Sequence, residues 1–415
     1  CWWHCRGPPW PCEGFMEPVK AVINNLKLRT SYGFTGNTEI GVYESLATLG
    51  SNSWTIGNQL VSGFYPNRIP NPDLKWEKTG QFDIGFDLGL FNNRLRLTAD
   101  YYYKKTTDLL YNVAIPSASG YDSMLKNIGS VQNKGYELSI ESDNLSGAFS
   151  WTTAFNISLN RNKVLELGGE TYKDVGTYDD HLKTSDIRRL IVGQPIGVFY
   201  GYRFDGIFQN EAECAQQTSS PSPIGVGLRR YKDLNGDGKI DATNDREILG
   251  DANPKFFGGM TNTFAYKGFE LNVFLQYSYG NKIFNYNAME LESPTGGQNV
   301  YQDLVNRWTP TNPSNEYQKA TTNRNNIVSD RFIEDGSFLK LKTVSLSYSF
   351  PKLNWKHIGG LRLYVTGQNL LTWTKYRGYD PEVSYRGAST LEAGEDFGGY
   401  PQARTFMFGI KLDIK

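Results

Sequence analysis

The sequence has 415 residues, and its 43 basic and 43 acidic side chains give a net charge of zero, so we expect no nucleic-acid partner. No apolar run approaches the ~18–20 residues that a membrane helix needs, which excludes a helical membrane protein. A transmembrane β-barrel remains compatible with the composition, because only alternate residues of each strand face lipid.

The chain begins with a segment that is unlike the rest. Residues 1–14 hold three of the four cysteines, Cys1, Cys5 and Cys12, and share no pattern with the sequence that follows. A metal cluster that includes His4 is the weaker interpretation, because the spacing matches none of the usual zinc patterns. We expect residues 1–14 to be foreign to the fold and residues 15–415 to form one β-rich unit.

Alternation of apolar and polar residues is the strongest pattern in the chain. Between residues 82 and 90, for example, apolar side chains at even positions alternate with Asp or Gly at odd positions. The segments with this pattern are 82–90, 95–103, 149–160, 269–279 and 405–414. Globular strands usually have ~5–6 residues, whereas membrane strands need ~9–11, so the lengths favour strands with one face toward lipid.

The connections between these segments alternate between short and long. We predict tight turns at 91–94, 144–147 and 267–268, and long polar connections at 36–73, 108–130, 163–193, 209–255, 281–329 and 375–402. Outer-membrane barrels have this asymmetry, whereas compact soluble domains rarely contain such loops.

The predicted fold class is therefore all-β, a partial antiparallel transmembrane β-barrel. We count about ten or eleven strands, roughly half of the ~22 strands found in large transporter barrels. The alternative is a secreted β-sandwich, whose strands would be shorter and spaced ~8–12 residues apart.

One loop has the composition of a calcium site. From residue 233 onward, oxygen donors stand at alternate positions and a glycine stands at the sixth, as in an EF-hand loop. The candidate ligands are Asp233, Asn235, Asp237, the Lys239 carbonyl and Asp245. Position twelve of an EF-hand is Glu, and Asn244 occupies it here, so the end of the loop is irregular. The alternative is a polar turn that binds no ion. Structural Ca²⁺ is the only cofactor that we predict.

Aromatic residues suggest two further roles. Five of them lie near predicted strand ends, where Tyr and Trp commonly occupy the membrane–water interface: Tyr101, Tyr102, Tyr103, Trp373 and Tyr376. Five others, in the long connections, are candidates for stacking on sugar rings: Tyr43, Trp54, Tyr65, Tyr178 and Tyr286. Residues 299–308 have helical spacing and predict a short helix within a loop.

No motif indicates an enzyme. The three histidines, His4, His181 and His357, lie far apart in the sequence, and no Gly-x-Ser-x-Gly motif accompanies them. The sequence contains no phosphate-binding loop and no dinucleotide motif. We therefore expect no catalytic residues.

A series of short motifs resembles one known family. The motifs are NNLKLR at 24–29, PNPDLKWE at 70–77, NIGSV at 127–131, NKGYE at 133–137, GQPIG at 193–197, DRFIEDGSF at 330–338, GQNL at 367–370 and YDPE at 379–382. In this order they resemble the C-terminal half of the SusC/RagA-type TonB-linked outer-membrane proteins, which are TonB-dependent receptors.

The resemblance implies a function and a location. It implies a barrel in the cell outer membrane that imports oligosaccharides, peptides or other large nutrients. The implied partners are a SusD/RagB-like surface lipoprotein, the TonB complex and outer-membrane lipid. Because the sequence shows no plug and no TonB box, we expect a barrel portion without the TonB-coupling region. The alternatives are a passive outer-membrane barrel or adhesin and, from another class, a secreted carbohydrate-binding β-sandwich.

Overall fold

A computed structural model of the chain describes residues 22–37, 45–114, 121, 123–175, 187–293, 299–322, 326–350, 358–387, 389 and 391–414. Segment 1–14, which the sequence predicts to be foreign, lies outside these residues, as do the three histidines.

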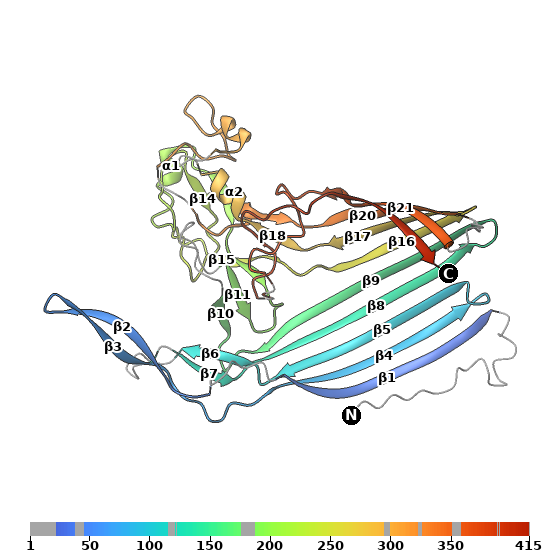
Figure 1. Cartoon of the computed structure of the whole chain (residues 1–415). Helices are drawn as coiled ribbons and strands as arrows, with labels where there is room; N and C mark the ends of the chain where they lie inside the picture. The colour runs from blue at the N-terminus through green and yellow to red at the C-terminus, as the bar shows by residue number, and fades with distance from the viewer. Residues whose placement is uncertain are drawn as a thin grey trace.

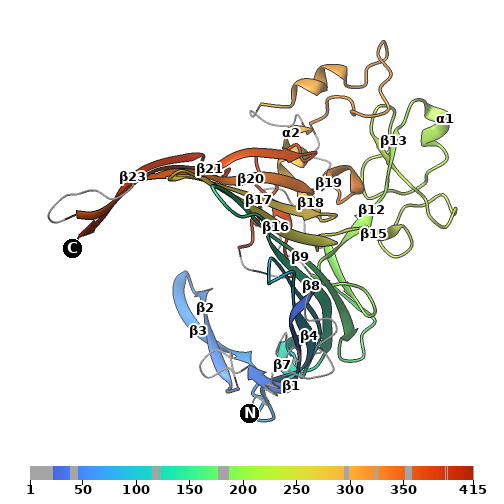
Figure 2. The same ribbon diagram turned by 90° about the vertical axis from the view of Figure 1, so that its right-hand side faces the viewer.

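Ten long antiparallel strands form a single sheet (Figure 1). In spatial order they are β1 (Ile23–Asn37), β4 (Glu77–Leu90), β5 (Leu95–Thr107), β8 (Ser130–Leu145), β9 (Phe149–Glu166), β16 (Phe256–Tyr266), β17 (Phe269–Tyr279), β20 (Phe338–Ser349), β21 (Ile358–Thr374) and β23 (Thr405–Ile414). Figure 2 shows this sheet as a strongly curved wall. A sandwich needs two sheets packed face to face, and all ten long strands belong to one sheet, so the sandwich alternative is wrong.

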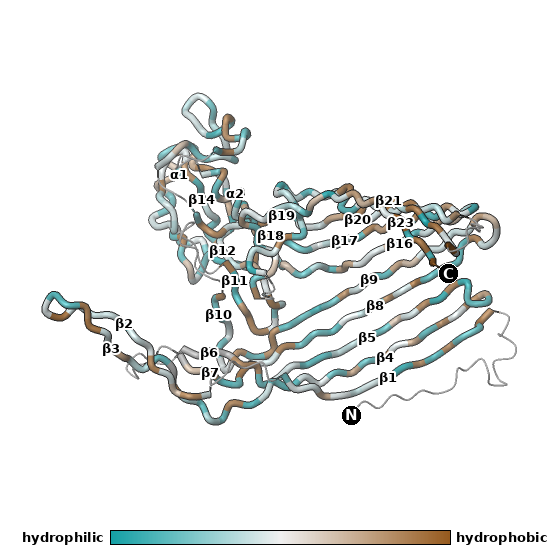
Figure 3. The backbone as a smooth tube through the Cα atoms, in the orientation of Figure 1, coloured by the Kyte–Doolittle hydropathy of each residue, from teal (hydrophilic) through white to brown (hydrophobic). Residues whose placement is uncertain are grey.

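One side of the wall is apolar and exposed, whereas a soluble protein would bury such a side in its core. In β4 the side chains of Phe82, Ile84 and Phe86 are 37%, 40% and 38% exposed, whereas Gly85 between them is buried. Figure 3 shows the alternation of apolar and polar residues along the strands. A surface with so many exposed apolar residues requires a non-aqueous neighbour, and in a membrane barrel this neighbour is lipid. We call this side the outer face and the opposite side the polar face.

Several charges on the polar face pair with one another across strands. Arg29 of β1 lies 3.1 Å from an Asp87 carboxylate oxygen on β4 and 3.0 Å from an Asp100 carboxylate oxygen on β5. Arg96 likewise contacts Glu141 and Asp143 on the neighbouring β8. Cross-strand pairs of opposite charge stabilise a sheet, so these contacts help to fix the register of the first four strands.

Tight turns join the strands at one end of the wall. Lys267 and Gly268 link β16 to β17, and both have positive φ angles of 46° and 89°. This is the backbone that a two-residue hairpin of right-handed twist requires, and glycine adopts it without steric cost. A side chain at Gly268 would also meet the Ser349 carbonyl.

The long connections at the other end of the wall are folded rather than extended. Two are hairpins: β2 (Thr48–Ile56) with β3 (Gln59–Arg68), and β6 (Leu110–Ala114) with β7 (Ser123–Asn127). The other elements are β10 (Tyr172–Val175), β11 (Arg188–Ile191), β12 (Val198–Tyr202), β13 (Phe204–Ile207), α1 (Glu211–Cys214), β14 (Arg229–Tyr231), β15 (Arg246–Asp251), β18 (Lys282–Asn285), α2 (Tyr286–Leu291), η4 (Gln302–Asn306), η5 (Asp330–Phe332), β19 (Ile333–Asp335) and β22 (Glu395–Asp396).

Among the described residues, helices are few and short. The predicted loop helix at 299–308 corresponds to the 3₁₀ helix η4, which is shorter than the pattern indicated. Within the described ranges, none of the helices has the length and apolar character needed to cross a bilayer.

The two faces predict opposite responses to the same substitution. Ile140 of β8 lies on the outer face, paired with Phe155, and Ser139 beside it lies on the polar face. We expect Ile140→Arg to destabilise the membrane-inserted protein by about 2–4 kcal/mol, because the charge enters hydrocarbon, and Ser139→Arg to have little effect. Denaturant midpoints of both variants in lipid vesicles measure the difference. Equal losses of stability would contradict the assignment of the faces.

Candidate functional site

The loop elements form a compact unit, which we call the loop module: β10 to β15, α1, β18, α2, η5 and β19. Figure 1 shows it at the end of the wall opposite the tight turns. Its core contains Phe199, Phe284 and Phe332, which are fully buried, together with Tyr286 and Met289 of α2. Unlike the wall, the loop module therefore has a conventional core that forms in water.

Buried ion pairs connect the elements of the loop module. The Glu292 carboxylate, after α2, accepts a 2.6 Å hydrogen bond from Arg331 Nε and lies 3.3 Å from Arg377 Nη1. Arg377 also pairs with Glu334 of β19 at 2.9 Å. Burial alone would lower the pKa of the Arg377 guanidinium, but its contacts with Glu334 and Glu292 raise that pKa above the usual value. Removing one partner of such a network would leave a buried charge uncompensated.

A second buried pair joins segments far apart in sequence. Arg188 of β11 is fully buried, with Nε 3.1 Å from the Glu395 carboxylate of β22. Its guanidinium stacks 4.2 Å from the Phe199 ring centre and donates to the main-chain carbonyls of Gly197 and Ala393. Burial raises the pKa of the Glu395 carboxyl despite the nearby arginine. The pair therefore fixes the position of β22 against β11 at a considerable desolvation cost.

Residues 375–404, which we call the strap, connect the loop module to the wall. Lys340 of β20 is 1% exposed, and its Nζ lies 2.6 Å from both the Asp380 and the Glu382 carboxylates of the strap. Lys342 donates a further 2.9 Å bond to Glu382. An irregularity in the pairing of β20 with β21 lies between Leu341 and Thr343, next to both lysines. β-Bulges commonly redirect a side chain in this way.

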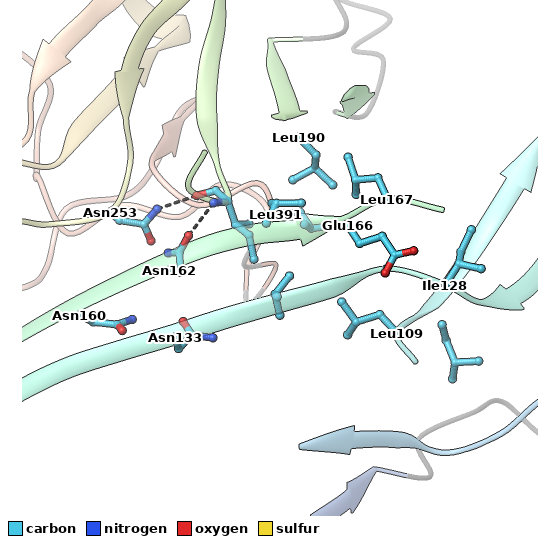
Figure 4. Close-up of a pocket in the computed structure, with 15 residues that line it drawn as sticks. Leu109, Ile128, Asn133, Asn160, Asn162, Glu166, Leu167, Leu190, Asn253 and Leu391 are labelled. Carbon is cyan, nitrogen blue, oxygen red and sulfur yellow. Dashed lines mark hydrogen bonds between the residues drawn. The ribbon is translucent and has the colours of Figure 1, made fainter. Parts of the chain in front are cut away.

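A pocket of about 460 Å³ lies on the polar face, where β8 and β9 meet the loops (Figure 4). This volume is within the range of small-molecule sites, ~300–1,000 Å³. Four asparagines and the Glu166 carboxylate form its polar part, and the apolar part includes Leu109, Ile128, Leu167, Leu190 and Leu391. The pocket thus offers an apolar wall beside a row of carboxamides.

The carboxamides of the pocket are only partly engaged by the protein. Asn162 Oδ1 accepts a 2.6 Å bond from the Ile196 amide, and Asn253 donates to the Ile196 carbonyl. Asn160 Oδ1 accepts a 3.0 Å bond from the Tyr102 hydroxyl. Among the described residues, the Asn133 carboxamide makes no hydrogen bond with protein. Free amide donors and acceptors beside an apolar wall fit a ligand with hydroxyl or amide groups.

The predicted calcium loop is an ordered turn. The two Asp233 carboxylate oxygens accept 2.7 Å bonds from the main-chain amides of Gly236 and Gly238, which both have positive φ angles. Asp237 Oδ1 accepts a 2.8 Å bond from the Lys239 amide, and the Asn235 side chain donates to Asp237 Oδ2. Each carboxylate oxygen keeps a free lone pair after accepting one such bond.

Asp245 closes the base of this loop. It is fully buried and accepts 2.8 Å bonds from the main-chain amides of Leu234 and Asp241. In the described part of the chain, no three His, Cys, Asp or Glu side chains gather as a metal-binding group. The turn brings Asp233, Asn235 and Asp237 together, and the ion itself stays a prediction.

Three of the predicted aromatic positions differ in the structure. Tyr286 is buried in the core of the loop module, so it does not present a stacking surface for sugars. Tyr376 is also buried and donates a hydrogen bond to Asp396, so it is not an interface residue. Tyr102 faces the polar side and contacts Asn160, unlike its neighbours Tyr101 and Tyr103.

The other predicted aromatic residues are either exposed or outside the described part of the chain. Trp373, Trp54 and Tyr65 are exposed. Tyr43 and Tyr178 lie outside the described residues.

Long antiparallel strands with an apolar outer face, tight turns at one end and folded loops at the other define a transmembrane β-barrel wall. The sequence matches the family described as "TonB dependent receptor-like, beta-barrel" over residues 19–212. It is 41% identical to TonB-dependent receptor P3 of Formosa agariphila, over 96% of this chain and 40% of the relative. It is 29% identical to TonB-dependent receptor SusC of Bacteroides thetaiotaomicron, over 97% of this chain and 39% of the relative.

Solved structures give the same result. The structure of the RagAB peptide transporter superposes with a TM-score of 0.80 and 27% identity, over 97% of this chain and 42% of that chain. The chain belongs to the TonB-dependent receptor family and forms part of its outer-membrane barrel. It spans about 40% of the length of the curated relatives that it matches. These relatives are named as receptors rather than as enzymes.

The contacts of the strap predict its response to mutation and to pH. Lys340→Met leaves two carboxylates without their main partner, so we expect docking of the strap to weaken by about 3 kcal/mol. Lys342→Met is the matched control, because Glu382 keeps its bond to Lys340. A spin label at position 379, where Tyr379 is exposed, reports the mobility of the strap. Equal mobility of the strap in both variants would contradict the role of Lys340 in holding it to β20.

The pH dependence follows from the same carboxyl groups. Burial tends to raise the pKa of Asp380 and of Glu382, but hydrogen bonds from Lys340 bring both pKa values below their usual range. Docking of the strap is therefore strongest above about pH 4.5, which lies above the pKa values of Asp and Glu in an unfolded chain. It weakens as the pH falls through the lower pKa values of the docked state. In Lys340→Met this dependence should be flatter.

Proposed function

We propose that this chain provides part of the barrel wall and outer loops of a TonB-dependent importer of oligosaccharides, peptides or other large nutrients. The main support is the pocket on the polar face, because that face lines the interior of a membrane barrel. The named relatives, a SusC receptor and a peptide transporter, support an import function.

The chemistry of the pocket supports a hydrogen-bonding oligomer as cargo. The carboxamides of Asn133 and Asn160 can bind hydroxyl groups of a glycan or amides of a peptide equally well. The leucine side of the pocket suits the apolar face of a sugar ring or an apolar side chain. Peptides and glycans therefore both belong in the proposed substrate range.

We propose two partners for the complete importer. A SusD/RagB-like surface lipoprotein would bind at the loop end, where the loop module and the exposed β2–β3 hairpin lie beyond the wall (Figure 1). The TonB complex would supply the energy for uptake. Similarity to SusC and to the RagAB transporter supports both assignments.

The test of the import function is uptake by cells that express pocket variants. We expect Asn133→Leu and Asn160→Leu each to raise the concentration for half-maximal uptake by about threefold to tenfold, the effect of one lost hydrogen bond. Ser139→Leu, on the polar face of β8 outside the pocket, is the control. Growth on defined glycans and peptides as sole nutrients measures uptake. Wild-type uptake by all three variants would contradict the proposed site.

We also propose that the 233–245 loop holds a structural Ca²⁺ ion. Support comes from the hard oxygen donors Asp233, Asn235 and Asp237, which lie in one turn with lone pairs to spare. When bound, the ion would neutralise the clustered carboxylates and rigidify the loop.

Metal content tests this proposal. We expect purified protein to lose about one calcium ion per chain in Asp233→Ala and in Asp237→Ala. Asp205→Ala, which removes only a contact with Arg230, should keep its calcium. Elemental mass spectrometry of the three variants measures the ion. Identical calcium content throughout would leave the loop as a polar turn.

A further inference from the structure

Four cations gather on the outer face at the loop end of three neighbouring strands. Lys134 of β8 is paired directly with Arg161 of β9. One step further toward the loops, Lys105 of β5 and Lys163 of β9 stand on either side of Gln132. All four side chains are exposed, and we call them the cation cluster. Figure 1 shows β5, β8 and β9 side by side at this end of the wall.

The pairing within the cation cluster is unfavourable by itself. Residues directly opposite each other in antiparallel strands have Cβ atoms ~4.5–5.5 Å apart, and like charges at this distance destabilise a sheet. Among the described residues, none of the four cations forms a salt bridge. On the polar face, by contrast, Arg29 and Arg96 each contact two carboxylates. The outer face therefore carries positive charge that the described protein does not neutralise.

The position of the cation cluster is that of a lipid headgroup. Tyr103 stands directly opposite Lys134, and immediately on the membrane side lie Tyr101 and Tyr136, whose rings are 5.0 Å apart. Leu138 and Leu159 follow, so the outer face becomes aliphatic within a few residues. Tyrosines mark the interface between headgroups and hydrocarbon, and cations just beyond them lie at the depth of the headgroups.

At the opposite end of the same strands, the described outer-face side chains carry no such charge. There the polar groups are neutral and bond to one another: Asn262 Oδ1 accepts from Trp151 Nε1 at 3.0 Å and from the Thr153 hydroxyl at 2.7 Å. Asn144 donates to the same Thr153 hydroxyl. Because long loops of outer-membrane barrels face the cell exterior, the cation cluster lies in the outer leaflet.

We propose that the cation cluster binds the phosphate groups of an anionic lipid headgroup in the outer leaflet of the membrane. Nη1 of Arg161 donates to the main-chain carbonyls of Asn160 and Lys255, which leaves Nε and Nη2 to hold a phosphate through two parallel hydrogen bonds. The three lysines act as point charges around the phosphate. A bound phosphate changes the repulsion between Lys134 and Arg161 into a shared attraction. The proposal is independent of transport, since a barrel of any function would bind the same lipid.

The experiment compares charge-matched variants in nanodiscs. The probe is phosphorylated lipid A added to phosphatidylcholine nanodiscs that contain the membrane-inserted protein, with lipid retention measured by native mass spectrometry. Lys134→Gln/Arg161→Gln removes two charges from the cation cluster and should weaken retention about thirtyfold, at ~1 kcal/mol per charge. The control, Lys104→Gln/Lys267→Gln, removes one charge from the polar face and one from a tight turn. It should retain lipid as the wild type does.

Three outcomes would overturn the proposal. Equal retention by both double variants would show that the cation cluster is not the site. Equal retention of dephosphorylated lipid A would assign binding to the acyl chains alone. Displacement of the lipid by millimolar inorganic phosphate would indicate a site for free phosphate rather than for a headgroup.

A single substitution gives a second, independent readout. Lys134→Gln removes the like-charge pair, so in phosphatidylcholine alone we expect its melting temperature to rise. With phosphorylated lipid A present, the same variant should melt below the wild type, because it loses a lipid contact. A change of the same sign in both lipids would contradict the proposal. Heat-dependent gel mobility identifies any variant that has failed to fold.

Discussion

The absence of water in hydrocarbon is the constraint on which the rest of the structure depends. Backbone groups inside a bilayer must bond to one another, so a β-protein can cross it only with long, continuously paired strands. The ten-stranded wall meets this condition, with apolar residues outward and ion pairs such as Arg29 with Asp87 on the other face. The loop module is subject to the opposite condition, because it lies in water and buries Phe199, Phe284 and Phe332. The wall therefore exposes its apolar residues and the loop module buries them, and the change occurs at the loop end of the strands.

The wall could be predicted from the sequence because its signal is local. The predicted segment 269–279 has the same bounds as β17, and the turns predicted at 91–94 and 267–268 lie where the structure has them. The turn predicted at 144–147 lies at 146–148, because β8 continues to Leu145. A period of two needs only neighbouring residues to be recognised, and a membrane strand repeats it for longer than a globular strand does. The same alternation placed Tyr102 among the polar positions. Tyr102 is therefore not an interface residue like Tyr101 and Tyr103.

The loop module and the pocket could not be predicted in the same way. Arg188 and Glu395 form a buried pair although 207 residues separate them, and no local pattern connects them. The pocket likewise combines Asn133 and Asn160, which stand at polar positions of two strands, with leucines from remote loops. The position of Lys340 depends on an irregularity in the pairing of β20 that the alternation of its residues does not reveal. Long-range packing, rather than propensity, decides all three features.

The strap has a mechanical consequence. It is bonded to β20 through Asp380 and Glu382, and to the loop module through Glu395, which pairs with Arg188, and through Arg377, which pairs with Glu334 and Glu292. Any rigid displacement of the loop module away from the wall would stretch this segment between two anchors of buried charge. Small forces on the outer loops are therefore transmitted to the wall at β20, so these two parts of the chain respond to a load as a single stiff body.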